Sequence, residues 1–262
     1  MLIIDEYDRV GDTETHTRLA ETLKHLSDAA SETKIIVVGV AETLADLIGQ
    51  HASLTRCLAQ VKLERMRHDE LMEIIRTGES RLGAAFHQDI AKKIVALSDG
   101  FPYYTHLLCL LSAENAAGVL LEEAGASVVI AQPQYIYAIE SAVRSAEGSL
   151  RDSYQQAVIT LRRKTDMFRM VLWSIAYSEK IEVQVQEIAD GISLLTGAKI
   201  KKESLSSYLG PLSSEGKGYI LTRVRQGFYR FSDPLMRAFV RLIMEEDNIR
   251  LDGQLEFPWM RP

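Results

Sequence analysis

The sequence has few residues of the kinds that build disulfides, metal sites or nucleophilic triads. Its only cysteines, Cys57 and Cys109, each lie in an apolar helical context. This favours small buried side chains in a reducing cytoplasm over a disulfide framework or a zinc site. No Ser-His-Asp or Cys-His arrangement is indicated. The histidines never pair at metal-ligand spacing, and they are His16, His25, His51, His68, His87 and His106.

Long apolar runs and a strong basic charge are also missing. No run approaches the ~20 apolar residues that a membrane span needs, and the N-terminus lacks the pattern of a signal peptide. We therefore expect a cytoplasmic protein with no membrane partner. The net charge of −6 excludes polyanion binding by bulk charge, so any nucleic-acid contact would need a local basic face. With 262 residues the chain can form one large domain or two to three small ones.

Residues 1–64 predict part of a parallel sheet covered by helices. The apolar run 1–4 and the β-branched run 34–39 are typical of buried strands, and 15–30 has helical spacing of leucines. Strand, helix and strand in this order form a βαβ unit. A helix is predicted over 41–50. A short strand is predicted over 61–63, so the predicted sheet has two to three strands. We expect further strands of this sheet upstream of Met1 or on another chain.

From His68 onward the pattern is helical, so the fold class is an α/β fragment followed by mainly α structure. Residues 65–148 are expected to form a helical domain, and 149–165 a connector helix that spans roughly 150–163. Helices are predicted over 70–81, 88–97, 102–117 and 134–145.

Residues 166–247 predict a winged helix, that is, three helices followed by a β-hairpin. Two alternating runs surround Arg225-Gln226-Gly227 and form the hairpin, and Pro234 begins a final helix. Residues 248–262 form a tail that either docks on a neighbour or is disordered. The helices are expected at 167–177, 184–195, 202–212 and 235–245, the strands at 218–224 and 228–231, and core side chains at Phe231, Leu235, Phe239 and Leu242.

Two acids, Asp5 and Glu6, end the first predicted strand. An unpaired buried carboxylate is costly, so a buried strand rarely ends in two acids without a function. The alternative is an ordinary strand end. The strand, helix and strand that contain them resemble the core of the AAA+ and STAND groups of P-loop ATPases. The resemblance implies that Asp5 helps to hold the Mg²⁺ of bound ATP, and that Glu6 orients or deprotonates the attacking water.

The same resemblance implies two further contacts with the γ-phosphate. A polar residue past the second strand makes one of them, and here this falls to Thr43 or is taken over by Glu42. Arg56 would make the other as a finger that reaches the nucleotide of a neighbouring subunit in a homo-oligomer. A guanidinium suits this task because it stays charged and can bind phosphate in a bidentate manner. The alternative for Arg56 is a surface ion pair with Glu42 or Asp46.

The run Ser98-Asp-Gly-Phe-Pro102 precedes the helix over 102–117. STAND ATPases use Gly-x-Pro at such a helix start to approach the base and sugar of the nucleotide. By resemblance, Gly100 and Pro102 therefore bind the cofactor, and 65–148 is the lid of the ATPase. Initiators of the origin-recognition type have an arginine where this chain has Tyr103. The alternative is a plain helix start, because glycine permits the turn and proline suits the first helical position.

Basic residues are concentrated between positions 199 and 241. This segment contains nine basic residues and only three acids, Glu203, Glu215 and Asp233, which gives a local excess of six positive charges. Lys201 and Lys202 open the third helix and Arg225 lies at the wing, so duplex DNA is an expected partner. The alternative is a packing and relay module, because 231–239 resembles the end of the winged helix in prokaryotic STAND-type ATPases. The nine are Lys199, Lys201, Lys202, Lys217, Arg223, Arg225, Arg230, Arg237 and Arg241.

The sequence contains no Gly-x-x-x-x-Gly-Lys-[Ser/Thr], so the backbone cradle for phosphates is absent. The leading interpretation is the C-terminal part of a prokaryotic STAND/AAA+ regulatory ATPase that uses ATP and Mg²⁺. Its N-terminal half would be on the same or a separate chain, and hydrolysis would require that half. The alternative function is a non-enzymatic winged-helix module that binds DNA in DNA transactions or transcription control.

Overall fold

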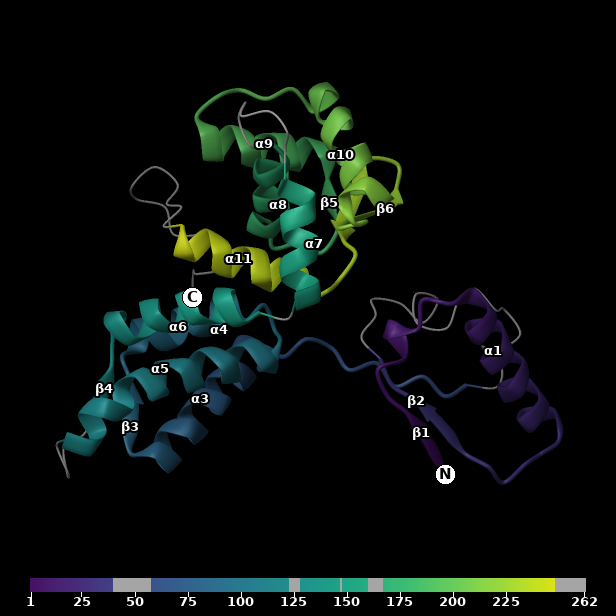
Figure 1. The fold of residues 1–262 in the computed structure, drawn as a ribbon, viewed down its shortest axis with the longest axis horizontal. Helices are drawn as coiled ribbons and strands as arrows, with labels where there is room; N and C mark the ends of the chain where they lie inside the picture. The colour runs from purple at the N-terminus through teal and green to yellow at the C-terminus, as the bar shows by residue number, and fades with distance from the viewer. Residues whose placement is uncertain (40–57, 123–127, 147, 160–166, 248–262) are drawn as a thin grey trace. The chain divides into compact units, whose positions relative to one another are not determined.

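A computed structural model describes residues 1–39, 58–122, 128–146, 148–159 and 167–247. The chain divides into two compact units, residues 1–64 and 65–262 (Figure 1). The helix predicted over 41–50 and the tail 248–262 lie outside the described residues. Among the helices that are described, none combines the length and apolar character needed to cross a membrane.

The first unit is the predicted βαβ arrangement. Strand β1 (Leu2–Ile4) pairs in parallel with β2 (Ile35–Val37). The connection runs through a short 3-10 turn, η1 (Tyr7–Arg9), and helix α1 (Thr13–Asp28). The α1 helix begins two residues before the predicted start, because the Asp12 side chain accepts hydrogen bonds from the first free backbone N–H groups.

The strands of this unit are less buried than the sequence predicted. The core consists of Tyr7, Ala20 and Leu23, whereas Leu2 and Ile3 of β1 remain about half exposed. The prediction of a third strand over 61–63 is wrong. That segment has no regular structure, and Val61 is 82% exposed, since no described strand lies beside it to accept its backbone hydrogen bonds.

The second unit starts with a group of four helices, here called the helical bundle. Its helices begin within two residues of the predicted starts, and α5 extends five residues beyond the predicted end. A small parallel sheet of β3 (Ala84–Phe86) and β4 (Val128–Ile130) corrects the wholly helical expectation. Strands of three residues are too short to show a period in the sequence. The bundle helices are α3 (His68–Leu82), α4 (Gln88–Leu97), α5 (Pro102–Glu122) and α6 (Gln132–Ser145).

Helix α7 (Gly148–Val158) leads into the C-terminal part of the second unit. A three-stranded antiparallel sheet forms here in the order β5-β7-β6, and its hairpin turns at Gly227, which has a φ of 78°. The predicted order of helices and hairpin is confirmed, with β5 as an additional strand. The elements are α8 (Met167–Tyr177), β5 (Val183–Gln184), α9 (Val185–Thr196), η3 (Lys202–Leu205), α10 (Ser206–Leu212), η4 (Glu215–Lys217), β6 (Leu221–Arg225), β7 (Phe228–Phe231) and α11 (Met236–Glu246).

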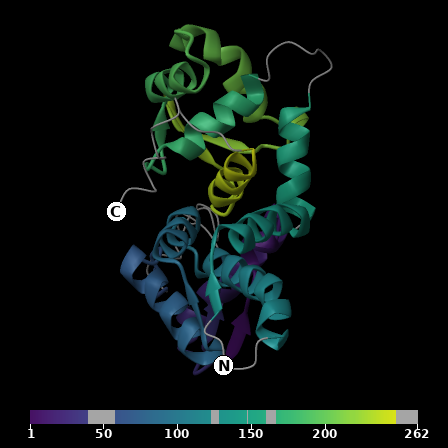
Figure 2. The same cartoon turned by 90° about the vertical axis from the view of Figure 1, so that its left-hand side faces the viewer.

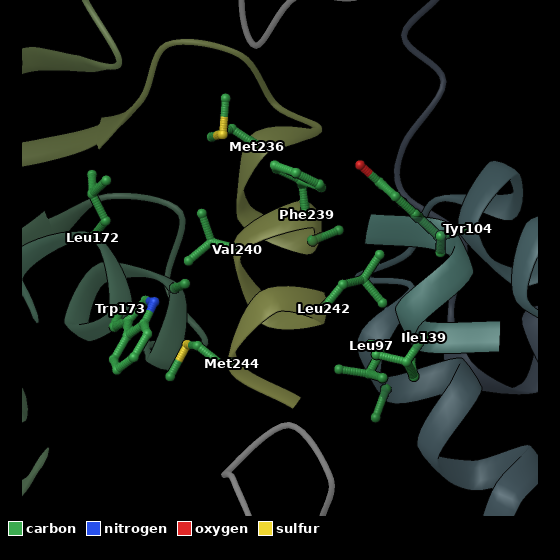
Figure 3. Close-up of a cluster of buried hydrophobic side chains, with 14 of the residues drawn as sticks. Leu97, Tyr104, Ile139, Leu172, Trp173, Met236, Phe239, Val240, Leu242 and Met244 are labelled. Atoms are coloured by element: carbon green, nitrogen blue, oxygen red, sulfur yellow. The ribbon is translucent and has the colours of Figure 1, made fainter. Parts of the chain in front are cut away.

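Helix α11 lies between α8 on one side and α4 and α6 of the bundle on the other (Figures 1 and 2). It is therefore apolar on two sides. Leu242 points toward the bundle, whereas Val240 and Met244 point toward α8 (Figure 3). The Phe239 ring lies edge-on to Tyr154 of α7, with ring centroids 6.2 Å apart. The core predicted at Phe231, Phe239 and Leu242 is confirmed, and Leu235 is partly buried.

Candidate functional site

Asp5 and Glu6 lie at the carboxyl edge of the parallel pair β1 and β2. The strand pairing extends past them, because Tyr7 N–H donates to the Val38 carbonyl at 3.0 Å and Val38 N–H donates to the Ile4 carbonyl at 2.8 Å. Asp5 and Glu6 lie in the chain between the two residues that make these bonds, Ile4 and Tyr7, and both are exposed. Glu6 has a φ of 55°. That left-handed conformation is uncommon outside glycine and is often found at functional sites.

The carboxylates at this edge are exposed to solvent and to ligands. Asp5 Oδ1 accepts the Glu6 N–H at 2.8 Å, and Glu6 makes a solvent-exposed ion pair with Arg9 at 3.5 Å. Carboxylate oxygens are the ligand type that Mg²⁺ prefers, so the exposed Asp5 side chain is of the right chemistry for the metal role predicted for it. Within the described residues, no group of three or more His, Cys, Asp or Glu side chains is placed to hold a metal ion.

The turn between α4 and α5 contains Gly100 and Pro102. Asp99 and Gly100 are both left-handed, with φ of 52° and 81°. Met66 N–H donates to the Gly100 carbonyl at 2.9 Å, and a Cβ atom at Gly100 would lie 2.6 Å from the Cβ of Arg65. Glycine is thus required by the chain's own packing. Pro102 opens α5 and is exposed, so of the two residues it is the one open to a ligand.

The same turn places the Asp99 carboxylate among three arginines, and we call Asp99, Arg65, Arg237 and Arg241 the Asp99 cluster. Arg237 binds the carboxylate in a bidentate manner, with Nε–Oδ2 of 2.8 Å and Nη2–Oδ1 of 2.7 Å. Arg241 Nη1 lies 3.0 Å from Oδ1, and Arg65 Nη1 donates to Oδ2. The side chains of Asp99, Arg237 and Arg241 are all less than a tenth exposed.

The Asp99 cluster contains more positive than negative charge, because three guanidinium groups surround one carboxylate. Burial alone would raise the pKa of Asp99, but Arg241, Arg237 and Arg65 together lower it below its ordinary value. Burial lowers the pKa of Arg241 to about 9, and the neighbouring Arg237 and Arg65 act in the same direction. The carboxylate is therefore held ionised, and the positive charge is in excess.

Carbonyl groups at the end of α8 and just beyond it accept further hydrogen bonds from the two buried arginines. Arg237 Nη1 donates to the Lys180 carbonyl at 2.9 Å, and Arg241 Nε donates to the Ala176 carbonyl at 2.9 Å. Arg241 Nη2 also reaches the Ser178 carbonyl at 3.1 Å. Free carbonyls at a helix C-terminus carry partial negative charge, so they offset part of the excess.

The predicted basic face is smaller than the sequence indicated. Arg237 and Arg241 belong to the Asp99 cluster and cannot contact DNA, so seven basic residues remain against three acids and the local excess falls from six to four. Lys217 Nζ is also directed to the Gln156 and Ile159 carbonyls of the preceding segment. The charge count wrongly included Arg237 and Arg241, which are buried because α11 packs between α8 and the bundle.

The three residues predicted to contact DNA are exposed. Lys201 and Lys202 lie at the start of η3, immediately before α10. Arg225 ends β6, pairs with Glu182 at 3.5 Å and stacks over the Phe228 ring at 3.9 Å. The three side chains thus belong to one part of the second unit. Arg225 would have to leave its partner Glu182 to bind phosphate.

Two predicted contacts, Thr43 and Arg56, lie outside the described residues, as does Glu42. The predicted residues that are described fall into separate units. Asp5 and Glu6 belong to the first unit, and Gly100 and Pro102 to the second. The Asp99 cluster was not predicted from the sequence. Its signal was the pair of arginines four residues apart in a helix whose other residues up to Met244 are all apolar.

Comparison with known proteins gives only distant similarities. No family model matches the chain, and no curated protein matches it. The RuvB Holliday junction branch migration motor of Thermotoga maritima has a TM-score of 0.42 and 15% identity over 95% of this chain and 70% of that chain. The Orc1 protein of Aeropyrum pernix in complex with DNA has a TM-score of 0.40 and 16% identity over 94% of this chain and 64% of that chain.

The chain spans about two thirds of the length of these structures. Two mutants of the same RuvB match 87% of this chain and only 65% and 66% of their own length. At TM-scores and identities this low, the similarities say nothing about the function of this chain.

Proposed function

We propose that this chain is the C-terminal part of a STAND/AAA+ regulatory ATPase that couples the state of a bound nucleotide to a winged-helix domain. The observation that supports this most directly is the exposed pair of acids, Asp5 and Glu6, at the carboxyl edge of two parallel strands. Ligands of parallel α/β sheets bind outside this edge. In the proposal, Asp5 helps to hold Mg²⁺ and Glu6 acts on the attacking water.

The domain order favours the same proposal. After the βαβ unit come the helical bundle, as the lid over 65–148, a connector over 149–165 and the part over 166–247. In that last part the order is α8, β5, α9, α10, β6 and β7, with the sheet order β5-β7-β6. A helix, a short strand, two helices and a hairpin form the winged-helix motif, which we assign to α8–β7. With the following helix α11 it makes up the proposed winged-helix domain over 166–247.

Nucleotide binding would need phosphate-binding residues from outside these 262 residues. ATP and Mg²⁺ are the cofactors of the complete assembly in this proposal, and Pro102 and Thr43 are its proposed nucleotide contacts in this chain. Arg56 would act in a neighbouring copy within a homo-oligomer. The base would pack on the exposed start of α5 at Pro102 and Tyr103.

The test is ATP turnover by this chain together with the polypeptide encoded directly upstream, either co-expressed or fused. We expect turnover from the pair and none from the 262-residue chain. Glu6→Gln should abolish hydrolysis and retain ATP binding, because only the group acting on water is removed. Glu14→Gln, an exposed acid in α1, is the control and should leave turnover unchanged. Turnover by the chain alone that disappears in Glu6→Gln would contradict the need for an outside phosphate site.

A second candidate function is a winged-helix module that binds duplex DNA without catalysis. It is favoured by the exposed side chains of Lys201, Lys202 and Arg225. Lysines near the start of the third helix of this motif would lie against the DNA backbone, where each phosphate contact releases counterions and makes affinity depend on salt.

Fluorescence anisotropy with a labelled duplex at several salt concentrations tests this function. The double variant Lys201→Glu/Lys202→Glu should weaken binding to all sequences, and it should lower the slope against salt by about one for each lysine that binds a phosphate. The control Lys24→Glu/Lys92→Glu makes the same change in net charge at exposed positions of α1 and α4. If both pairs weaken binding equally, the attraction is one of bulk charge. If no binding occurs at low salt, the winged helix serves only as a relay.

A further inference from the structure

We infer that the Asp99 cluster is a releasable joint, which fastens the winged-helix domain to the helical bundle and opens when the turn at 98–102 shifts. The inference deepens the proposed function and rests on it only for the trigger, because the turn ends at Pro102, which is a proposed nucleotide contact. The joint itself is argued from the hydrogen bonds of Asp99, Arg237 and Arg241.

These hydrogen bonds show which side chains would stay with the winged-helix domain and which with the bundle if the two separated. On one side, Arg237 and Arg241 belong to α11 and donate to carbonyls at and just beyond the end of α8, which is also part of the winged-helix domain. On the other side, Arg65 remains with the turn, where it donates to the Asp99 side chain. If the carboxylate moves away, the α11 arginines keep these carbonyl partners. These polar contacts within the domain would therefore survive its separation from the bundle.

Asp99 supplies the ionised side chain that joins these arginines to the bundle. Two other side chains of the bundle each make a single hydrogen bond to α11 or to the residue before it: Tyr104 Oη donates to the Leu235 carbonyl at 3.2 Å, and Tyr135 Oη donates to Glu245 at 2.9 Å. The Asp99 carboxylate makes a bidentate pair and two further bonds at one point. Charge-assisted bonds of this kind are roughly twice as strong as neutral ones.

The turn that holds Asp99 is short and fixed at both ends. The Ser98 hydroxyl donates to the Ile94 carbonyl at 2.7 Å, and the buried Thr105 hydroxyl donates to Ser98 Oγ at 2.8 Å. Between these ends Asp99 and Gly100 are left-handed, so the turn has little freedom to absorb a shift. A displacement at the start of α5 would thus move the carboxylate, which must align with two guanidinium groups.

Two reporter thiols on α11 test the joint. Leu242 faces Leu97 and Ile139 of the bundle, whereas Val240 faces Leu172 of α8 (Figure 3). In a Cys57→Ser/Cys109→Ala background, Leu242→Cys reports separation from the bundle and Val240→Cys reports unfolding of the winged-helix domain. Labelling by a thiol reagent is followed in the full chain without nucleotide.

Asp99→Asn should accelerate labelling of Leu242→Cys by on the order of a hundredfold and labelling of Val240→Cys far less. Asp89→Asn, an exposed acid on α4, is the control and should change neither rate. Equal acceleration at both thiols, or none at either, would overturn the joint. If Asp99→Asn fails to fold, the two reporters are compared in the chain with Asp99 intact. Faster labelling of Leu242→Cys than of Val240→Cys supports the joint, and equal labelling rates overturn it. The ATP turnover test with Glu6→Gln is independent, so failure of the joint and failure of the proposed function are told apart.

Discussion

Asp99 and Arg237 are 138 positions apart in the sequence, yet Arg237 binds both carboxylate oxygens of Asp99 at 2.7 and 2.8 Å. The pair joins the turn before α5 to the helix that closes the C-terminal part of the chain. Both side chains are less than a tenth exposed. A buried ion pair with further hydrogen bonds is tolerated only while both partners stay, because either one alone is an uncompensated charge.

Asp99→Asn should therefore lower the free energy of unfolding by about 3–5 kcal/mol, since it leaves three guanidinium groups without their carboxylate. Urea unfolding monitored by circular dichroism measures the change. The control is Asp89→Asn, whose side chain is 73% exposed and which should leave the midpoint nearly unchanged. Similar midpoints for the two variants would show that the Asp99 cluster adds nothing to stability.

Acid should weaken the chain partly through Asp99. Although burial opposes ionisation, the arginines keep the pKa of the folded carboxyl below its ordinary value. A carboxyl whose pKa is lower in the folded than in the unfolded state adds stability above the unfolded pKa, and this stability disappears as pH falls through the folded pKa. Unfolding free energies measured from about pH 5 downward should fall less steeply in Asp99→Asn than in the parent chain. Parallel curves would contradict the shift.

Local features of the sequence were sufficient for most helices and for the hairpin. Helix α4 was predicted at its observed bounds, because Ile90, Ile94 and Val95 repeat at helical spacing. The hairpin followed from two alternating runs around a glycine that adopts a positive φ. Such signals depend on neighbours within a few positions, which is why they can be recognised without the fold.

The partners of the buried charges could not be recognised in this way. Asp99 meets Arg237 and Arg241 only because α11 folds back onto the bundle, and residue counts assign arginines to the surface by default. Strand β3 was missed because its partner β4 lies more than forty positions away, and neither has enough residues to show alternation. The roles predicted for Asp5, Glu6 and Pro102 remain predictions.

Tyr135→Phe should loosen a second fastening between the bundle and α11. The Tyr135 hydroxyl is buried and donates to Glu245 Oε1 at 2.9 Å, while Lys93 lies 3.9 Å from the same oxygen. Removal of a hydrogen bond to a charged acceptor should lower the free energy of unfolding by about 2 kcal/mol. Tyr137→Phe on the same helix is the control, because that residue is 41% exposed. Equal thermal midpoints for the two variants would contradict the role of the bond.

Two glycines inside helices should respond to alanine with opposite signs. A Cβ atom at Gly191 in α9 would lie 2.3 Å from Ser174 Oγ, and that hydroxyl donates to the Ile188 carbonyl at 2.8 Å. Gly191→Ala should therefore destabilise the chain by about 1–3 kcal/mol through overpacking against α8. Gly78 in α3 has no atom within 4 Å of such a Cβ, so Gly78→Ala should stabilise the chain by about 1 kcal/mol through helix propensity. Urea unfolding of both variants measures the two effects, and a stabilised Gly191→Ala would contradict the close packing of α8 and α9.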